Sequence, residues 1–325
     1  MLIVVKTFMH EHPIDGGVMV LDVPDYDPSD LSKNIPTGVY GIDRALIDPR
    51  MGQVVLLAGS EGTGKSTLIG QFMLNAIAYG FKSMIFSGEM GAEMIKQWVY
   101  NQAAQNVAYM TKIDIKYDRV DYAPRPQLKK MIDKHVGNNL IIFDDNILLG
   151  ENPPRILDVF EEHAKRKGVK VFVIDNMMTS DYERYGPRGN TNIQETNFMR
   201  AATSMAKRIG VLIYVIDHPR KVTAGGSRKI ENDEISGSGG KKNLAQITII
   251  LDRNDEEPDV TYAHIKKNRF GSIKTDVPML FDISKREYRC KEKGVTTAYP
   301  WVLEYEVWLQ NEREQSKKNK RLEVK

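Results

Sequence analysis

Apolar residues in this chain of 325 amino acids gather in short continuous runs, separated by longer stretches of helical periodicity. The centre of each run is continuously apolar rather than alternating, as strands buried on both faces require. They cover residues 53–58, 82–87, 139–143, 170–174 and 211–216. Between the runs, apolar residues recur at helical spacing over about 68–77, 92–105, 127–136, 154–168 and 193–209. Alternating strands and helices predict an α/β fold with a mostly parallel central sheet flanked by helices.

Later parts of the chain follow a different pattern. Runs at 247–251, 260–266 and 277–283 succeed one another without helices, which predicts late antiparallel strands. Residues 109–125 and 177–192 are polar and irregular, which predicts loops.

We expect this domain to span residues 36–290, with a different segment on each side. Residues 1–35 carry two short apolar runs around a polar turn, then a polar, proline-containing stretch, which predicts a hairpin and a linker. The turn contains His10 and His12, which are better explained as solvated side chains than as metal ligands. Residues 291–325 form a C-terminal segment that ends in six basic, three acidic and two aliphatic residues among its last 15. This composition predicts a frayed, flexible tail, with nucleic-acid contact as the alternative.

Composition narrows the class of protein. The chain is 41% hydrophobic and 27% charged, as in ordinary globular proteins. A net charge of +3 is too small to indicate nucleic-acid binding, so any basic surface must be local. Cys290 is the only cysteine, which excludes an intramolecular disulfide and favours a reducing compartment. Because no apolar run approaches 18 residues, we expect no membrane partner and a location in the cytoplasm or at the nucleoid.

One motif organises the chain, at residues 59–66. It fits the pattern G-x-x-x-x-G-K-[ST] and lies between a predicted strand and a predicted helix, which disfavours an ordinary glycine-rich turn. Backbone N–H groups of such a loop, with the N-terminus of the following helix, bind nucleotide phosphates. Lys65 should reach the β- and γ-phosphates, and Ser66 should bind Mg²⁺. The predicted nucleotide-binding residues are Gly59, Ser60, Glu61, Gly62, Thr63, Gly64, Lys65, Ser66 and Thr67.

Polar residues at the carboxyl ends of the strands are the further candidates, because ligands collect at that edge of a doubly wound sheet. Glu89 could activate the attacking water as a general base, which we favour over a solvated carboxylate at the junction of strand and helix. Asp175 could hold the hydration shell of Mg²⁺. Asp144 competes with it, and we favour Asp175 because the longer loop follows it. His218 could contact the γ-phosphate.

Two cations lie in a predicted turn after a late strand, in the sequence Lys266-Lys267-Asn268-Arg269-Phe270-Gly271. Taken alone, Lys267 and Arg269 would be solvated charges of a hairpin.

The order of these motifs resembles a known family. A phosphate loop, Glu89-Met90, Asp175, His218, Gly237-Ser238-Gly239 and the basic turn succeed one another as in the RecA-like motor domain of DnaB-type hexameric replicative helicases. The similarity covers about residues 36–283 and is closest to the phage and mitochondrial (Twinkle-like) branch, in which a histidine ends the sensor strand.

The resemblance implies a set of roles. Lys65 and Ser66 would serve the phosphates and Mg²⁺, Glu89 would be the catalytic base, and Asp175 would be the second metal-side group. His218 would sense the γ-phosphate. Arg269, with Lys267 beside it, would be an arginine finger for the neighbouring subunit, and Arg253 would pack near the base. The residues that would face single-stranded DNA are Arg220, Lys221, Arg228, Lys229, Lys241 and Lys242.

The function so implied is an ATP- and Mg²⁺-dependent helicase motor, assembled as a hexameric ring on single-stranded DNA, with a primase or polymerase acting in trans. The chain departs from the family pattern after Gly239, where it has Gly240, Lys241, Lys242 and Asn243 in place of a small residue and an Arg-Gln or similar pair. Two rival functions remain: a recombinase or recombination mediator that forms filaments, and a regulatory RecA-like ATPase that does not bind DNA.

Overall fold

The computed structural model describes residues 30–218, 239–253, 257–271, 274–283, 285–292 and 298–323. The chain divides into two units, residues 1–33 and 34–325. The hairpin predicted in the first unit lies outside the described residues. The described residues from Asn34 onward belong to the second unit.

A nine-stranded sheet forms the centre of this unit, in the order β11-β10-β9-β8-β1-β7-β6-β2-β5. The strands are β1 (Val54–Gly59), β2 (Lys82–Ser87), β5 (Leu140–Ile142), β6 (Val169–Asp175), β7 (Leu212–Asp217), β8 (Ile247–Arg253), β9 (Val260–Asn268), β10 (Thr275–Asp282) and β11 (Glu287–Cys290). The six strands from β8 to β5 run parallel to one another. We predicted that the late strands pair antiparallel, and this was wrong for one edge of β8. That strand pairs in parallel with β1 on one edge and antiparallel with β9 on the other. β10 and β11 continue antiparallel, as predicted for β10.

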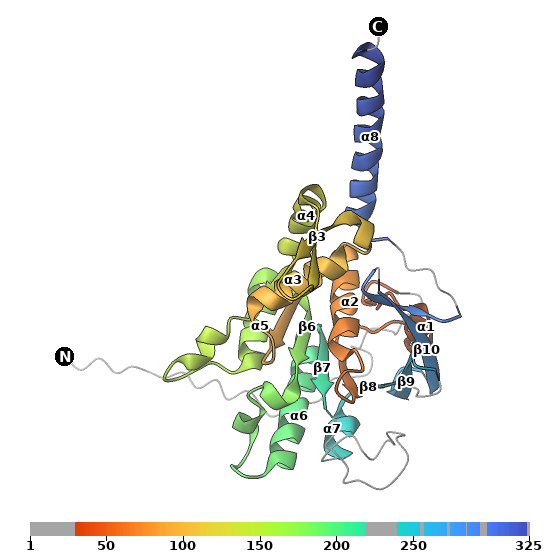
Figure 1. Cartoon of the computed structure of the whole chain (residues 1–325). Helices are drawn as coiled ribbons and strands as arrows, with labels where there is room; N and C mark the ends of the chain where they lie inside the picture. The colour runs from red at the N-terminus through yellow and green to blue at the C-terminus, as the bar shows by residue number, and fades with distance from the viewer. Residues whose placement is uncertain are drawn as a thin grey trace, which may run out of the picture. The chain divides into compact units, whose positions relative to one another are not determined.

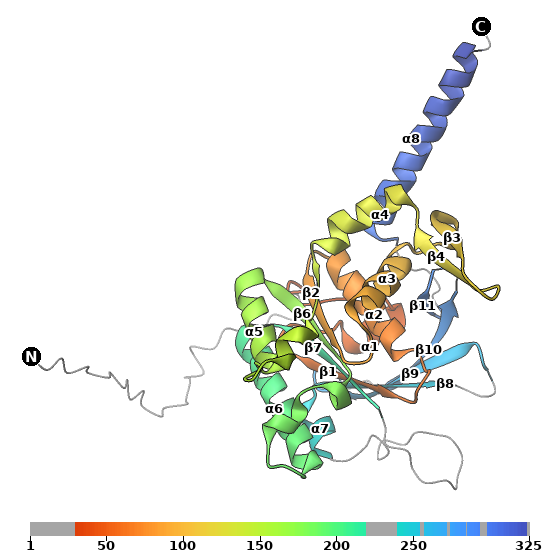
Figure 2. The same cartoon turned by 60° about the vertical axis from the view of Figure 1, so that its left-hand side comes forward.

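Helices cover both faces of the sheet, so successive residues of its central strands enter two different cores. Val55 and Leu57 of β1 pack into the core on one face, and Val54 and Leu56 pack into the core on the other. The first core is completed by α1 (Tyr40–Leu46), α2 (Lys65–Ala78), α3 (Ala92–Ala103), α4 (Pro126–Ile132) and the start of α8 (Pro300–Glu323). The second is completed by α5 (Ile156–Lys167) and α6 (Thr191–Ile209), as Figure 2 shows. A short helix, α7 (Gly239–Leu244), lies beside α6 (Figures 1 and 2).

Residues 109–125 form a hairpin rather than the predicted loop. β3 (Met110–Asp114) and β4 (Val120–Pro124) pair with each other in a separate two-stranded sheet. Most of their side chains are exposed or half-buried, so the hairpin lacks the alternation of apolar and polar residues that marks a strand with one buried face. The short elements α1 and β11 were likewise not predicted.

The predicted frayed tail is wrong as well, because α8 continues as a helix to Glu323. Pro300 suits the first position of a helix. The residues that follow are mostly Glu, Gln, Lys and Arg, without Gly or further Pro, and these residues favour helix. Trp301 anchors the start of the helix, where its indole N–H donates to the Ala103 carbonyl at 2.8 Å. From there α8 extends away from α4 (Figure 1).

None of the helices in the described ranges is both long enough and apolar enough to cross a membrane.

Candidate nucleotide site

The loop between β1 and α2 depends on glycines for its conformation. Gly62 and Gly64 have φ angles of 75° and 86°, in the region that side chains other than hydrogen disfavour. A Cβ atom at Gly64 would also lie 2.0 Å from the hydroxyl oxygen of Tyr288. The same hydroxyl donates to the Thr63 carbonyl at 3.3 Å, so β11 supports the loop from outside. The sequence could not predict this contact, because Tyr288 comes from a distant, unpredicted strand.

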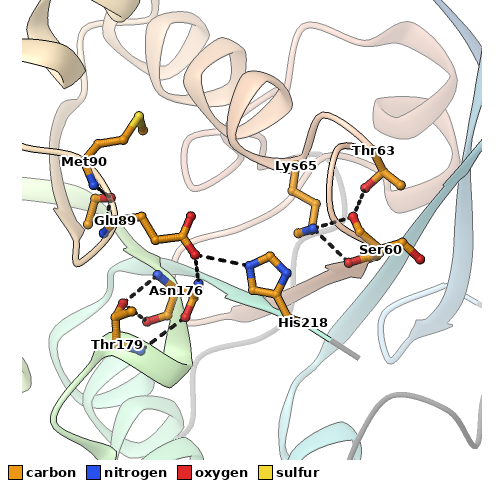
Figure 3. Close-up of polar contacts among 10 residues, drawn as sticks. Ser60, Thr63, Lys65, Glu89, Met90, Asn176, Thr179 and His218 are labelled. Carbon is orange, nitrogen blue, oxygen red and sulfur yellow. Dashed lines mark hydrogen bonds and ion pairs between the residues drawn. The ribbon is translucent and has the colours of Figure 1, made fainter. Parts of the chain in front are cut away.

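Lys65 holds its ammonium inside the loop. Its Nζ donates to the carbonyls of Gly59 at 2.8 Å and Ser60 at 2.7 Å (Figure 3). The residue is only 5% exposed. Burial lowers the pKa of Lys65, while the charges of Asp175 and Glu89 act in the opposite direction. A positive group is therefore fixed where the loop can receive an anion.

Ser66 and Asp175 meet at the first turn of α2. Their side chains are hydrogen-bonded to each other, and Asp175 is buried at the end of β6. Burial raises the pKa of Asp175, while the Ser66 hydrogen bond and the charges of His218 and Lys65 lower it. Asp144, the competing candidate, is exposed and instead accepts a hydrogen bond from the backbone N–H of Asn146.

A hydroxyl and a carboxylate are hard oxygen donors, so this pair fits Mg²⁺. Within the described ranges no group of three or more His, Cys, Asp or Glu could hold a metal ion. A magnesium ion at Ser66 and Asp175 would therefore need oxygens of phosphate and water for its other ligands, which is its usual mode of binding beside nucleotides.

Glu89 lies between two polar side chains that follow other strands (Figure 3). The side-chain amide of Asn176 donates to Oε1 of Glu89, and Nε2 of His218 lies 3.5 Å from the same oxygen. Asn176 is itself held by Thr179, whose backbone N–H donates to the Asn176 side chain at 3.2 Å. We did not predict Asn176 as a site residue. The available signal was its place directly after Asp175, at the carboxyl end of a buried strand.

These residues line one cavity of about 740 Å³. Its lining includes residues of the phosphate loop, Glu89, Asn176 and His218, together with Arg253, Phe281 and Tyr288 of the late strands. The structure thus places Lys65, Ser66, Glu89, His218 and Arg253 of the sequence-predicted site around one cavity.

Lys267 and Arg269 lie elsewhere and are not among the residues that line this cavity. Their side chains donate to the Asn243 carbonyl of α7, at 2.9 Å from Lys267 and 2.8 Å from Arg269. Burial lowers the pKa of Lys267 to about 8, and the neighbouring Arg269 adds to this effect. Arg269 is exposed.

Of the six residues predicted to face DNA, the structure describes the side chain of Lys241 alone. Lys241 does not line an open surface: it is 1% exposed, and its Nζ lies 2.9 Å from Glu195 and 3.1 Å from Asp217. That prediction was wrong for this residue, because two buried carboxylates hold the ammonium inside the protein. The predicted contacts outside the described residues are Arg220, Lys221, Arg228, Lys229 and the side chain of Lys242.

Comparison with known proteins finds relatives in sequence and in fold. A relative described as a DNA helicase/primase, from Enterobacteria phage T3, is 23% identical over 272 residues, which cover 79% of this chain. The chain spans about half of that relative, 46% of its length.

Solved structures share the fold at low sequence identity. One of them, described as an ATPase domain, has a TM-score of 0.63 at 19% identity, covering 78% of this chain and 90% of that one. A DnaB-like replicative helicase, studied with its interactions with primase, has a TM-score of 0.64 at 18% identity, covering 78% and 61%. The KaiC-like protein PH0186 from Pyrococcus horikoshii OT3 has a TM-score of 0.54 at 18% identity, covering 79% and 98%. The fold is therefore RecA-like.

The model of the DnaB-like helicase C-terminal domain family matches residues 34–289. This match spans the described sheet and the cavity at its carboxyl edge. The chain accordingly belongs to the DnaB-like helicase C-terminal domain family.

Proposed function

We propose that this chain is a motor that hydrolyses Mg-ATP at the interfaces of a hexameric ring and thereby moves along single-stranded DNA during replication. The observation that carries the proposal is the division of charged groups between two places. Lys65, Ser66 and Glu89 line one cavity, with Asp175 buried beside Ser66, whereas Arg269 lies outside it on an exposed turn. A site that lacks its own arginine finger is completed by a neighbouring subunit.

Binding begins at the phosphate loop. Lys65 gives up its two carbonyl bonds for the β- and γ-phosphates, and the loop N–H groups bind their oxygens. Ser66 and Asp175 would hold Mg²⁺, which when bound would neutralise charge on the phosphates. Arg253, which lines the same cavity, packs near the base.

Glu89 accepts the proton of the attacking water. Asn176 holds Oε1 of Glu89, which leaves Oε2 directed to the water. Nε2 of His218 lies 3.5 Å from the same Oε1 of Glu89. Because His218 directly follows β7, it can transmit the state of the γ-phosphate to the segment after that strand.

The proposed arginine finger, Arg269, requires contact between neighbouring subunits. Arg269 reaches a neighbour's nucleotide with Lys267 beside it, and such a head-to-tail contact closes into a ring when the rotation allows. Within the ring, Arg220, Lys221, Arg228, Lys229 and Lys242 track the DNA backbone without reading sequence. We place the motor at the replication fork, in the cytoplasm, with a primase or polymerase as a partner in trans.

The rate of ATP hydrolysis with and without single-stranded DNA, on a sample of measured mass, tests this function. We expect DNA to stimulate turnover and the mass to be that of a hexamer. A KaiC-like protein shares the fold, so a DNA-independent ATPase would favour the regulatory alternative. Long filaments instead of rings in negative stain with DNA would favour the recombinase alternative.

A further inference from the structure

Lys241 forms a buried cluster of charges that the nucleotide site does not explain. Its ammonium lies between Asp217, at the end of β7, and Glu195 of α6, and all three side chains are buried. Removing charges from water costs free energy, so a buried ion pair is weak evidence for stability. What such a cluster supplies is one fixed geometry, because removing the Lys241 ammonium would leave two buried carboxylates without that positive charge.

The cluster lies beside the proposed catalytic groups. Asp217 pairs in register with Ala58, directly before the phosphate loop. Burial lowers the pKa of Lys65, and the charge of Asp217 offsets a small part of that decrease. The next residue is His218, whose Nε2 faces Glu89. Among the described residues, no group hydrogen-bonds to the buried Nδ1 of His218. The position of this ring therefore depends on its contact with Glu89 and on the end of β7 that carries His218.

The helix that carries Lys241 makes two further contacts. The Asn243 carbonyl of α7 accepts hydrogen bonds from Lys267 and Arg269, and the Leu244 carbonyl accepts one from Thr203 of α6 at 3.4 Å. Both views place α7 beside α6 (Figures 1 and 2). This short helix thus connects the end of β7, in the subunit's own site, to the arginine proposed to serve a neighbour.

We propose that Lys241 is a positioning residue for ATP hydrolysis, which fixes the end of β7, with His218, and the finger-bearing turn through α7. Lys241 itself touches neither phosphate nor water. The inference rests on the proposed catalytic roles of Glu89, His218 and Arg269, but it concerns different side chains and can fail separately.

Lys241→Met tests the proposal, since methionine keeps an unbranched side chain without the charge. We expect kcat to fall about 10- to 100-fold, in line with the cost of a small misplacement of catalytic groups, while KM for ATP changes little. Thr203→Val is the matched control, because it removes a contact between α6 and α7 but none to β7, and it should keep normal turnover. Unchanged kcat in Lys241→Met would overturn the proposal.

A second variant separates positioning from stability, because Lys241→Met leaves two buried carboxylates. The triple variant Lys241→Met, Asp217→Asn, Glu195→Gln removes all three charges. We expect it to recover the thermal midpoint but not kcat. Recovery of both would overturn the proposal and make the cluster merely structural.

A direct readout uses the ring resonances of His218 in NMR spectra, assigned with a His218→Gln variant. These should shift in the triple variant and stay in place in Thr203→Val, and unshifted resonances in the triple variant would overturn the proposal. Glu89→Gln in the same hydrolysis assay isolates the underlying function. Full turnover in Glu89→Gln refutes the catalytic assignment, whereas the His218 resonances still decide the role of Lys241.

Discussion

Replacing Asn176 examines whether a neutral amide orients the proposed catalytic base. In Asn176→Ala, Glu89 loses the hydrogen bond to its Oε1, and the turn Met177–Thr179 loses the acceptor of its backbone N–H cap. Asn176 donates to no residue of the phosphate loop, so nucleotide binding should be spared. We expect the loss to appear in kcat, with little change in KM for ATP.

The size of the loss follows from the contact. A hydrogen bond to a charged group contributes about 1.5–3 kcal/mol, and each 1.4 kcal/mol is about tenfold in rate. The Glu89 side chain is 49% exposed, so water can replace part of the lost bond. The expected decrease in kcat for Asn176→Ala is therefore at the lower end, about tenfold.

Asn176→Asp is the informative companion variant in a steady-state ATP hydrolysis assay. Aspartate keeps an acceptor for the Thr179 N–H but replaces the donor to Glu89 with a repelling carboxylate. If Asn176 orients Glu89, Asn176→Asp should be at least as slow as Asn176→Ala. Normal turnover in Asn176→Asp with slow turnover in Asn176→Ala would refute the reasoning, because only the turn would then matter.

Other predictions concern the phosphate loop, the finger and one buried carboxyl. Lys65→Ala should abolish hydrolysis and weaken binding of a fluorescent ATP analogue while circular dichroism stays unchanged; normal turnover would contradict the nucleotide site. Arg269→Ala should bind ATP yet lose about 10³-fold or more in hydrolysis, and mixing it with Lys65→Ala subunits should partly restore activity; no recovery in linked dimers would exclude action in trans. Burial raises the pKa of Asp43 from 3.8 to about 7, so the folded state keeps a proton that the unfolded state loses. The free energy of unfolding gained from that proton is complete below about pH 4 and is lost as the pH rises to about 7. In urea unfolding, Asp43→Asn should lack this decrease in stability between the two pH values. Identical pH profiles for the variant and the wild type would contradict the assignment.

The sequence predicted those parts of the site that depend on local pattern. The phosphate loop, Glu89, Asp175 and His218 each follow a continuous apolar strand, and parallel strands bring their carboxyl ends to one edge. Contacts between segments that are distant in the sequence produce no such local pattern. Tyr288 reaches the loop from β11, and Lys241 is basic in sequence, like a DNA contact, yet is buried against Asp217 and Glu195.

Local pattern also failed where burial is slight. β3 and β4 are mostly exposed or half-buried, and the far part of α8 is polar, so neither has the periodicity that burial imposes. Such elements depend on intrinsic propensity and pairing rather than on a buried face.

Translocation along single-stranded DNA tests the central claim most directly. The measurement is the ATP-dependent displacement of streptavidin from biotin placed at either end of a single-stranded oligonucleotide. We predict displacement from one end only by the wild-type protein, and none by Glu89→Gln, which should still bind ATP and DNA. DNA-stimulated hydrolysis without displacement from either end would contradict the account.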